Sequence, residues 1–338
     1  MEKPVIGITM GDAAGIGPEI ILKALKDDNL YRICRPVVLG DIRVMEQIRD
    51  ICDIRLRLKT VESPEGLISS PDTVKVLDFN DVSPKDFKFG VVDPICGKAA
   101  VKYTIEAGRM ALDGRLGAMV SAPLNKASMR EAGYQHEGQT QILGELAGVK
   151  DYGMILVLED LRIMMYSTHM SLLDAIKKIS YESVLGKIEL AIKGMQLFKI
   201  KDPSIAVSAI NPHAGEGGLF GREEIDHIGP AIEAARKKGI NAIGPVPADI
   251  VFDRAQKGEY DLVIAMYHDQ ANLAVKLLGF GSVVTLLAGI PFIRTSTGHG
   301  TAFDIAGRNI ADGTNLIKAI ELAAELAKSS KKKQAASL

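Results

Sequence analysis

The sequence predicts a two-domain α/β protein in which a mostly parallel sheet is covered by helices on both faces. Three observations support this prediction. Short apolar runs typical of buried strands alternate with longer amphipathic segments along the chain. The 338 residues exceed the size at which a single core stops growing, so two domains are expected. The chain is 47% hydrophobic and contains 33 glycines, which suits many tight turns between strands and helices.

The expected elements follow from the spacing of apolar residues and from glycine and proline breakers. Apolar runs without helical spacing give strands, apolar residues three or four apart give helices, and Pro18 marks the first turn of one helix. In the first half this predicts strands at 5–10, 35–41 and 117–121, helices at 18–25, 44–50 and 98–112, and short strands with loops at 54–92. In the second half it predicts a hairpin of 155–159 with 161–166, strands at 204–210, 261–266 and 282–287, helices at 181–198 and 223–238, and a final helix capped by Gly313 or Thr314 and ending at Leu326.

Charge and cysteine content argue against several classes of protein. The formal net charge is −1 and there is no large basic block, so nucleic acid is not an expected partner. No stretch approaches the ~20 apolar residues of a membrane span, and the N-terminus leads into a strand without a signal peptide. The three cysteines, Cys34, Cys52 and Cys96, form no C-x-x-C pair, which argues against disulfides and a thiolate zinc site. We therefore expect a cytoplasmic protein without a membrane partner.

Three of the six histidines lie in short polar patches that interrupt strand-like runs. They are His169, His213 and His268. Imidazole is the commonest side-chain ligand of divalent metals. Three nitrogens without a thiolate leave coordination positions open, as in catalytic sites. Any one of the three is more simply a strand-end histidine held by hydrogen bonds, but the three together indicate a metal site.

A glycine-rich loop at 11–19 joins the first strand to the first helix. Its glycines permit a left-handed backbone and close approach, and the helix N-terminus offers amides to an anion. The loop is neither the dinucleotide fingerprint G-x-G-x-x-G nor a P-loop. Asp12 would repel a phosphate unless a cation intervened. Taken alone, the loop indicates a tight turn at least as well as a ligand cradle.

Motifs at both ends of the chain resemble the β-decarboxylating dehydrogenases of isopropylmalate and isocitrate. The loop at 11–19 is similar to their Gly-Asp-Gly-Ile-Gly-Pro-Glu, and 299–307 is similar to their adenine-side loop His-Gly-Ser-Ala-Pro-Asp-Ile-Ala-Gly. Between these ends the chain resembles the 4-hydroxythreonine-4-phosphate dehydrogenase family more closely. The segments that carry this resemblance are 121–126, 138–140, 168–169, 211–216, 244–249, 267–270 and 291–296. The resemblance implies a two-domain isocitrate/isopropylmalate dehydrogenase-like α/β/α fold with an interdomain cleft.

The resemblance also implies which part of the chain binds the cofactor and which binds the substrate and the metal. Residues 1–124 and 279–338 would form a discontinuous dinucleotide-binding domain, and 125–278 the substrate, metal and dimerisation domain. The cofactor would be NAD, with contacts from Gly11, Asp12, His299 and Asp304. One divalent metal per subunit (zinc, magnesium, manganese or cobalt) would be held by His169, His213 and His268. The third histidine would come from the partner subunit, so the active site would be shared within a homodimer. Nitrogen ligands favour zinc or another borderline ion.

Several further residues match substrate or catalytic positions of this family. Arg294 could clamp a carboxylate or phosphate with two parallel bonds. Lys276 could bind a phosphate or act as an acid–base group, against the alternative of a solvated helix lysine. Asp269 and Asp249 could orient an imidazole or relay the alcohol proton. For Asp249 a helix cap or turn is an equal alternative.

Two positions depart from the family members that serve vitamin B6 synthesis. Those members have His-Thr where this chain has Gln139-Thr140, and asparagine where it has Thr285; all three residues are expected to contact substrate. Thr140 could donate to a phosphate or carboxylate. Gln139 can form hydrogen bonds but cannot change charge. His136 could compensate for that loss, or be an ordinary loop histidine.

The leading hypothesis is metal-dependent, NAD-linked oxidation and decarboxylation of a 4-phosphorylated hydroxy acid. Segments 9–14 and 296–299 resemble the branch of the family that acts on 4-phospho-D-threonate or 4-phospho-D-erythronate. One alternative is the 4-hydroxythreonine-4-phosphate dehydrogenase step of pyridoxal phosphate (vitamin B6) biosynthesis. Others are a dehydrogenase of ring diols that carry a carboxylate, and a non-catalytic ligand-binding protein on the same scaffold. The intact histidines, Lys276 and Arg294 argue against the last.

Overall fold

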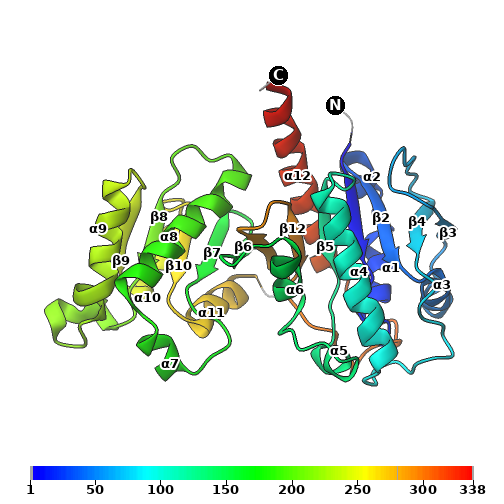
Figure 1. The fold of residues 1–338 in the computed structure, drawn as a ribbon, viewed down its shortest axis with the longest axis horizontal. Coiled ribbons are helices and arrows are strands. Elements are labelled where there is room, and N and C mark those ends of the chain that lie inside the picture. Colours follow the sequence, from blue (N-terminus) through cyan, green and yellow to red (C-terminus); the bar gives the residue numbers. More distant parts are fainter. Residues whose placement is uncertain (1–2, 280, 337–338) are drawn as a thin grey trace. The chain divides into compact units, whose positions relative to one another are not determined.

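The chain divides into two compact units in the computed structural model, which describes residues 3–279 and 281–336. Unit 1 comprises the described parts of Met1–Lys150 and Ile290–Leu338, and unit 2 is Asp151–Gly289. Each unit combines a sheet with helices packed on it (Figure 1), so the predicted α/β class is confirmed.

Unit 1 is built on a parallel sheet. Its elements are β1 (Val5–Thr9), α1 (Gly17–Ala24), α2 (Asp28–Ile33), β2 (Arg35–Gly40), α3 (Ile42–Ile51), β3 (Arg57–Thr60), β4 (Thr73–Asp78), α4 (Pro94–Leu112), β5 (Ala118–Ser121), α5 (Lys126–Glu131), α6 (Gln139–Leu146), β12 (Arg294–Thr297) and α12 (Thr314–Ala336). The strand order is β3–β4–β2–β1–β5–β12, and neighbouring strands run parallel. Every position of β1 is buried, so helices cover both faces of this sheet.

Unit 2 combines a hairpin with parallel strands. Its elements are β6 (Gly153–Leu158), β7 (Leu161–Met165), α7 (Leu172–Lys177), α8 (Tyr181–Met195), η1 (Gln196–Phe198), β8 (Ile205–Ser208), η2 (Pro212–Gly218), η3 (Glu224–Ile228), α9 (Gly229–Lys237), β9 (Ala242–Val246), α10 (Ala248–Gln256), β10 (Leu262–Ala265), α11 (His268–Gly279) and β11 (Val284–Ala288). The order is β11–β6–β7–β10–β8–β9. β6 is antiparallel to β11 and β7, as the hairpin prediction required, while β7, β10, β8 and β9 are parallel.

The unit boundaries differ from those expected from the sequence. The sequence assigned 125–150 to the second domain and 279–289 to the first, and the structure reverses both. Helices α5 and α6 pack on α4 in unit 1, where Met129 and Ile142 meet Val101 in one apolar cluster. Strand β11 lies in unit 2 because its backbone pairs with β6. These pairings join segments distant in sequence, so local patterns do not reveal them.

Some helix ends also differ from expectation. Helix α4 begins at Pro94 rather than at 98, because the Asp93 side chain accepts a hydrogen bond from the Ile95 amide and Pro94 fits the first turn. The helix expected at 223–238 is a π-helical turn, η3, followed by α9. Helix α12 continues to Ala336 instead of ending at Leu326, in keeping with the high helix propensity of the lysines and alanines that are frequent after Leu326.

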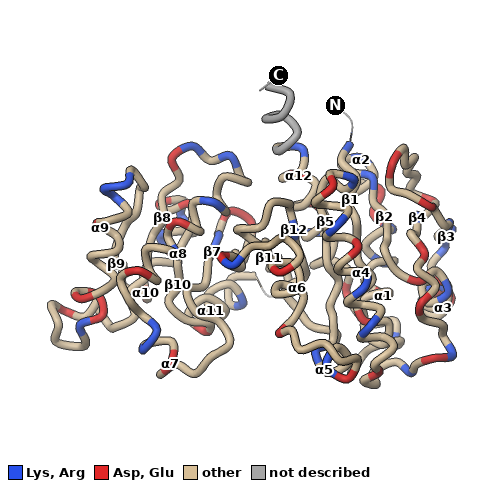
Figure 2. Tube along the Cα trace, in the orientation of Figure 1, with Lys and Arg blue, Asp and Glu red and all other residues tan. Residues whose placement is uncertain are grey.

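Charged residues of both signs occur throughout the chain. Along the described residues, acidic and basic positions are interspersed on the trace of each unit (Figure 2). Within that part of the chain, no helix combines the length and apolarity that a membrane span requires. Cys34, Cys52 and Cys96 are buried and unpaired, as predicted.

Two helical glycines provide a test of the close packing between α4 and α5. A Cβ on Gly97 would lie 2.1 Å from the carbonyl oxygen of Ser128 in α5, whereas a Cβ on Gly186 of α8 would meet nothing within 4 Å. Gly97→Ala is expected to lower the free energy of unfolding by about 1–3 kcal/mol because α5 must move. Gly186→Ala is expected to raise it by about 0.5–1 kcal/mol through helix propensity. Urea unfolding of both variants measures the difference, and equal effects would contradict the packing.

Candidate active site

The three histidines follow three neighbouring parallel strands of unit 2. Strands β7, β10 and β8 lie side by side and parallel, so their carboxyl ends share one edge of the sheet. His169 lies in the loop after β7, His268 is the first residue of α11 after β10, and His213 lies in η2 after β8. The polar patches seen in the sequence are therefore the carboxyl ends of strands, where ligands of parallel sheets bind.

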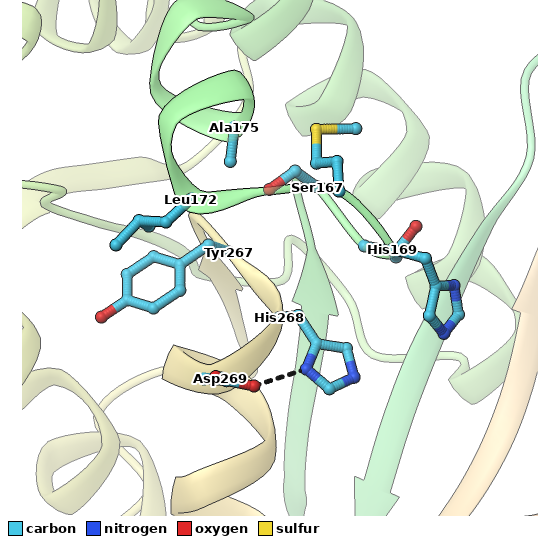
Figure 3. Close-up of a pocket in the computed structure, with 9 residues that line it drawn as sticks. Ser167, His169, Leu172, Ala175, Tyr267, His268 and Asp269 are labelled. Carbon is cyan, nitrogen blue, oxygen red and sulfur yellow. Dashed lines mark hydrogen bonds and ion pairs between the residues drawn. The ribbon is translucent and has the colours of Figure 1, made fainter.

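His169 and His268 line one cavity (Figure 3). Their ring centroids are 5.7 Å apart, and the cavity has a volume of about 450 Å³. The Nδ1 atom of His268 lies 2.6 Å from Asp269 Oδ1. Because this hydrogen bond places the proton of a neutral ring on Nδ1, the Nε2 lone pair is available to a metal. Asp269 is therefore hydrogen-bonded to the imidazole of His268. The rest of the lining is Ser167, Thr168, Met170, Leu172, Ala175 and Tyr267.

His213 does not join this pair within one chain. Its side chain is exposed, and it does not line the cavity. Across residues 3–279 and 281–336, no group of three or more His, Cys, Asp or Glu side chains is arranged to hold a metal ion. The structure of a single chain therefore brings together two of the three predicted nitrogen ligands, a donor set that suits a divalent ion but is incomplete.

Arg294 is a buried cation at the start of β12 in unit 1. It is 5% exposed, its Nε donates to Ser121 Oγ at 3.1 Å, and its Nη2 donates to Gln139 Oε1 at 3.0 Å. Burial lowers the pKa of the guanidinium to about 10, so it stays charged at neutral pH. No ion pair joins it to a carboxylate in the described part of the chain. A buried guanidinium held only by neutral groups is suited to bind an anion.

Gln139 holds Arg294 in place. Besides accepting from Arg294, its amide Nε2 donates to the Ala122 carbonyl at 3.0 Å, which fixes the orientation of the amide. Thr140 follows in the first turn of α6, and Lys126 lies beside Gly138, whose Cβ would be 3.8 Å from Lys126 Cε. The side chain of Gln139 is buried and engaged with the protein, so its contact is to Arg294. Ser121, the other partner of Arg294, was present in a family motif but was not among the predicted site residues.

The two loops expected to bind the cofactor lie against each other in unit 1. The Ile16 amide donates to the Thr301 carbonyl at 3.0 Å, and a Cβ on Gly15 would lie 3.0 Å from Thr301 Cβ. His299 and Asp304 are exposed on the second loop. The first and last predicted motifs, far apart in sequence, therefore form one surface.

Gly11 and Asp12 are buried residues of the glycine-rich loop at 11–19, and they determine its backbone conformation. Gly11 has φ +73°, and a Cβ there would lie 2.3 Å from the Pro123 carbonyl oxygen, so only glycine fits. Asp12 is fully buried, and its Oδ1 accepts from the Ala14 amide at 2.9 Å. Burial raises the pKa of Asp12 to about 6, with Asp93 adding to the rise, despite hydrogen bonds from Ser128 and Ala14.

The remaining predicted residues are more scattered. Lys276 is exposed on α11, about two turns beyond His268. Asp249 is exposed in the first turn of α10, a helix that packs on η2 and hence near His213. Thr285 is buried on β11 opposite Leu156. His136, considered as a substitute for the missing family histidine, pairs its Nε2 with Glu145 Oε2 at 2.9 Å.

Comparison with known proteins decides the family. The family described as pyridoxal phosphate biosynthetic protein PdxA matches residues 32–323. The chain belongs to the PdxA family. It is 44% identical to the D-threonate 4-phosphate dehydrogenase of Cupriavidus necator over 325 residues, covering 96% of this chain and 97% of that protein. The resemblance found in the sequence is therefore confirmed.

Two solved structures similar to this chain agree with the fold. The 4-hydroxythreonine-4-phosphate dehydrogenase of Klebsiella pneumoniae superposes with a TM-score of 0.90 at 39% identity, over 96% of this chain and 98% of that one. The terephthalate 1,2-cis-dihydrodiol dehydrogenase of Burkholderia xenovorans LB400 gives a TM-score of 0.65 at 30% identity, over 96% and 98%. The same scaffold thus carries dehydrogenases named for phosphorylated and for ring-diol substrates.

The buried carboxyl of Asp12 predicts a pH-dependent stability. Its pKa is raised from 3.8 to about 6 in the folded protein, so the folded state holds this proton more tightly than the unfolded chain does. The free energy of unfolding therefore falls as pH rises from the pKa of the unfolded chain to that of the folded protein. Above that range the ionised group costs on the order of 3 kcal/mol. Asp12→Asn keeps the acceptor for Ala14, and its free energy of unfolding should exceed that of wild type by about 3 kcal/mol at pH ~8 but by only about 1 kcal/mol at pH ~4.5. Urea midpoints at both pH values measure this, with Asp113→Asn controlling for the lost charge; a pH-independent difference would contradict it.

Proposed function

We propose that this chain is an NAD-linked dehydrogenase of a 4-phosphorylated hydroxy acid, with 4-phospho-D-threonate as the first candidate and 4-phospho-D-erythronate as the second. The paired imidazoles of His169 and His268 beside one cavity carry the proposal, because they provide a nitrogen donor set for a divalent ion. The identity to a D-threonate 4-phosphate dehydrogenase supports the choice of substrate. The exposed loop with His299 and Asp304 is the proposed contact surface for NAD, the hydride acceptor.

We assign the individual roles as follows. His169 and His268 hold the divalent ion, and His213 of the partner subunit completes the set. A bound divalent ion supplies positive charge that lowers the pKa of a coordinated hydroxyl. Asp269 keeps the His268 ring oriented. Arg294 binds an anionic group of the substrate, with Thr140 donating beside it and Gln139 fixing the guanidinium.

Proton transfer and decarboxylation complete the proposed reaction. Asp269 or Asp249 accepts the hydroxyl proton, and Lys276 serves as acid–base group or phosphate ligand. We propose loss of carbon dioxide from the oxidised product on the strength of the resemblance to the β-decarboxylating dehydrogenases. Thr285, buried and uncharged on β11, lies where the vitamin B6 enzymes have asparagine, and this favours a substrate other than theirs.

Exposed apolar side chains support the proposed homodimer. Leu219 and Phe220, directly after η2, are 72% and 49% exposed, and Leu273 and Leu277 form an apolar stripe on α11 with 62% and 85% exposure. Large apolar side chains gathered on a surface indicate an interface. Their position next to His213 and on the helix of His268 fits an interface at which ligands from two copies meet.

A substrate panel tests the proposed function. Purified protein with manganese or zinc should reduce NAD with 4-phospho-D-threonate or 4-phospho-D-erythronate and not with 4-phosphohydroxy-L-threonine. Arg294→Lys should lower kcat/KM at least about tenfold, because a single ammonium nitrogen lacks the planar fork of donors that can hold Ser121 and Gln139 while binding an anion through two parallel bonds. Arg130→Lys, on the exposed side of α5, is the matched control. Turnover of 4-phosphohydroxy-L-threonine alone would favour vitamin B6 synthesis, turnover of a ring cis-diol alone would favour the ring-diol reaction, and no turnover at all would favour a non-catalytic protein.

Mixing two inactive variants tests whether the site is shared. His169→Ala and His213→Ala should each abolish turnover. If His213 serves the partner's site, a mixed dimer contains one wild-type site, and random re-association of equal amounts should restore roughly a quarter of wild-type activity. Steady-state rates after co-refolding measure the recovery. Absence of recovery, with mixed dimers demonstrated by differently tagged chains, would place all ligands in one chain.

A further inference from the structure

The segment that carries His213 has an unusual backbone. Five consecutive residues of η2 lie in the left-handed region: His213 (φ 52°), Ala214 (54°), Gly215 (80°), Glu216 (44°) and Gly217 (66°). Residues other than glycine lose about 1–2 kcal/mol each in this conformation. Such a segment persists only where its surroundings hold it, and it is a frequent feature of functional sites.

The carboxylate of Glu224 is the group that holds this segment. Glu224 is 3% exposed, and its Oε1 accepts hydrogen bonds from the backbone amides of Ile210 at 2.9 Å and Asn211 at 2.8 Å. Its Oε2 accepts from Asn211 Nδ2 at 2.8 Å. A Cβ on Gly215 would lie 3.0 Å from the same Oε2. The carboxylate therefore bonds the entry to the left-handed turn and packs under its middle.

Gly221 and the π-helical turn η3 lie beside the contact between Glu224 and Asn211. A Cβ on Gly221 would lie 2.4 Å from Asn211 Nδ2, so glycine at this position makes room for the amide. Glu224 is the first residue of the π-helical turn η3, a local distortion often found at functional sites. In the described residues no lysine or arginine forms an ion pair with Glu224. The Glu224 carboxylate therefore accepts hydrogen bonds from amide groups instead of forming an ion pair. An uncharged side chain at this position would form weaker hydrogen bonds with the same amides.

We propose that Glu224 is the positioning residue for His213, with Asn211 as its partner. This inference rests on the proposed role of His213 as a metal ligand. Glu224 fixes the left-handed segment in the free protein, so the backbone that carries the imidazole is in place before a metal ion binds. The segment then loses its conformational entropy during folding and not when the metal ion binds. The affinity for the metal ion is correspondingly higher.

Glu224→Gln is the informative substitution. The Gln oxygen can still accept from the two backbone amides, but its NH₂ group then faces Asn211 Nδ2, also a donor. Asn211 cannot resolve this by turning its amide over, because Nδ2 also donates to Glu223 Oε2 at 2.6 Å, and an oxygen there would meet a carboxylate. Either orientation of the Asn211 amide leaves one unfavourable contact. Residues 210–218 should therefore become less well ordered, although the volume of the side chain at 224 is unchanged.

Glu223→Gln is the matched control. It removes the same charge one residue away, yet a Gln oxygen can still accept from Asn211 Nδ2, and the bonds of Glu224 are unaffected. We expect Glu224→Gln to weaken binding of Mn²⁺ alone by about 10–100-fold, the usual effect of losing a group that orients a ligand. Amide hydrogen exchange over 210–218 should accelerate in the same variant. Glu223→Gln should leave both readouts close to wild type, with the same assembly in sedimentation.

Titration calorimetry with Mn²⁺ and hydrogen exchange, both on the full-length protein, decide between the outcomes. Wild-type Mn²⁺ affinity in Glu224→Gln, together with weakened affinity in His213→Ala, would overturn the positioning role while leaving the proposed function intact. Unchanged affinity in His213→Ala would overturn the metal role itself. A purely structural role for Glu224 would lower the melting temperature without changing Mn²⁺ affinity.

A second variant covers the case in which Glu224→Gln does not fold. Asn211→Ala removes the amide that joins Glu224 Oε2 but keeps both backbone bonds to Oε1. It should weaken Mn²⁺ binding several-fold and accelerate exchange over 210–218. Wild-type values for both measurements would equally refute the proposal.

Discussion

Parallel strands place their carboxyl ends on one edge of a sheet. Within each unit, this constraint brings the candidate site residues that follow neighbouring strands to the same edge. In unit 2, β7, β10 and β8 are neighbours, and the segments after them carry His169, His268 and His213. In unit 1, β1, β5 and β12 are neighbours. Each of these strands is followed by a loop: the glycine-rich loop, the Ala122–Pro123 turn and the loop with His299. The glycine-rich loop forms backbone hydrogen bonds with both of the others, from Asp12 to Pro123 and from Ile16 to Thr301. Each candidate site is thus a consequence of strand order rather than of sequence proximity.

Arg294 and Glu224 are buried charges that form no ion pair within the described residues, and their hydrogen bonds differ. Arg294 is held by the side chains of Ser121 and Gln139, which use only part of its fork of donors. Glu224 faces backbone and side-chain amides of its own unit. A buried charge is costly unless it is hydrogen-bonded. The donors left on Arg294 make it suited to a ligand, whereas the acceptors of Glu224 are occupied by the chain and make it suited to hold a loop.

The sequence predicted the fold class, the β6–β7 hairpin and the location of the histidines, because strand ends interrupt apolar runs visibly. It could not place residues 125–150, since the side chains of Met129 and Ile142 only show which core they join once α4 lies beside them. The contact of Gln139 with Arg294 and that of Glu224 with the His213 segment depend on tertiary structure in the same way. Ordinary glutamates and glutamines give no local signal of such contacts.

The placement of His213 also explains why a strained, well-secured segment is useful. In the proposed site, this imidazole serves a metal ion whose other ligands belong to a second copy of the chain. Such a ligand has no contact with the ion or its other ligands until two copies meet, so its own unit must fix its position. Exposure alone would leave the ring mobile, and ordering it on metal binding would reduce affinity. The buried carboxylate of Glu224 resolves this conflict because it holds the backbone that carries the ring, while His213 itself stays exposed.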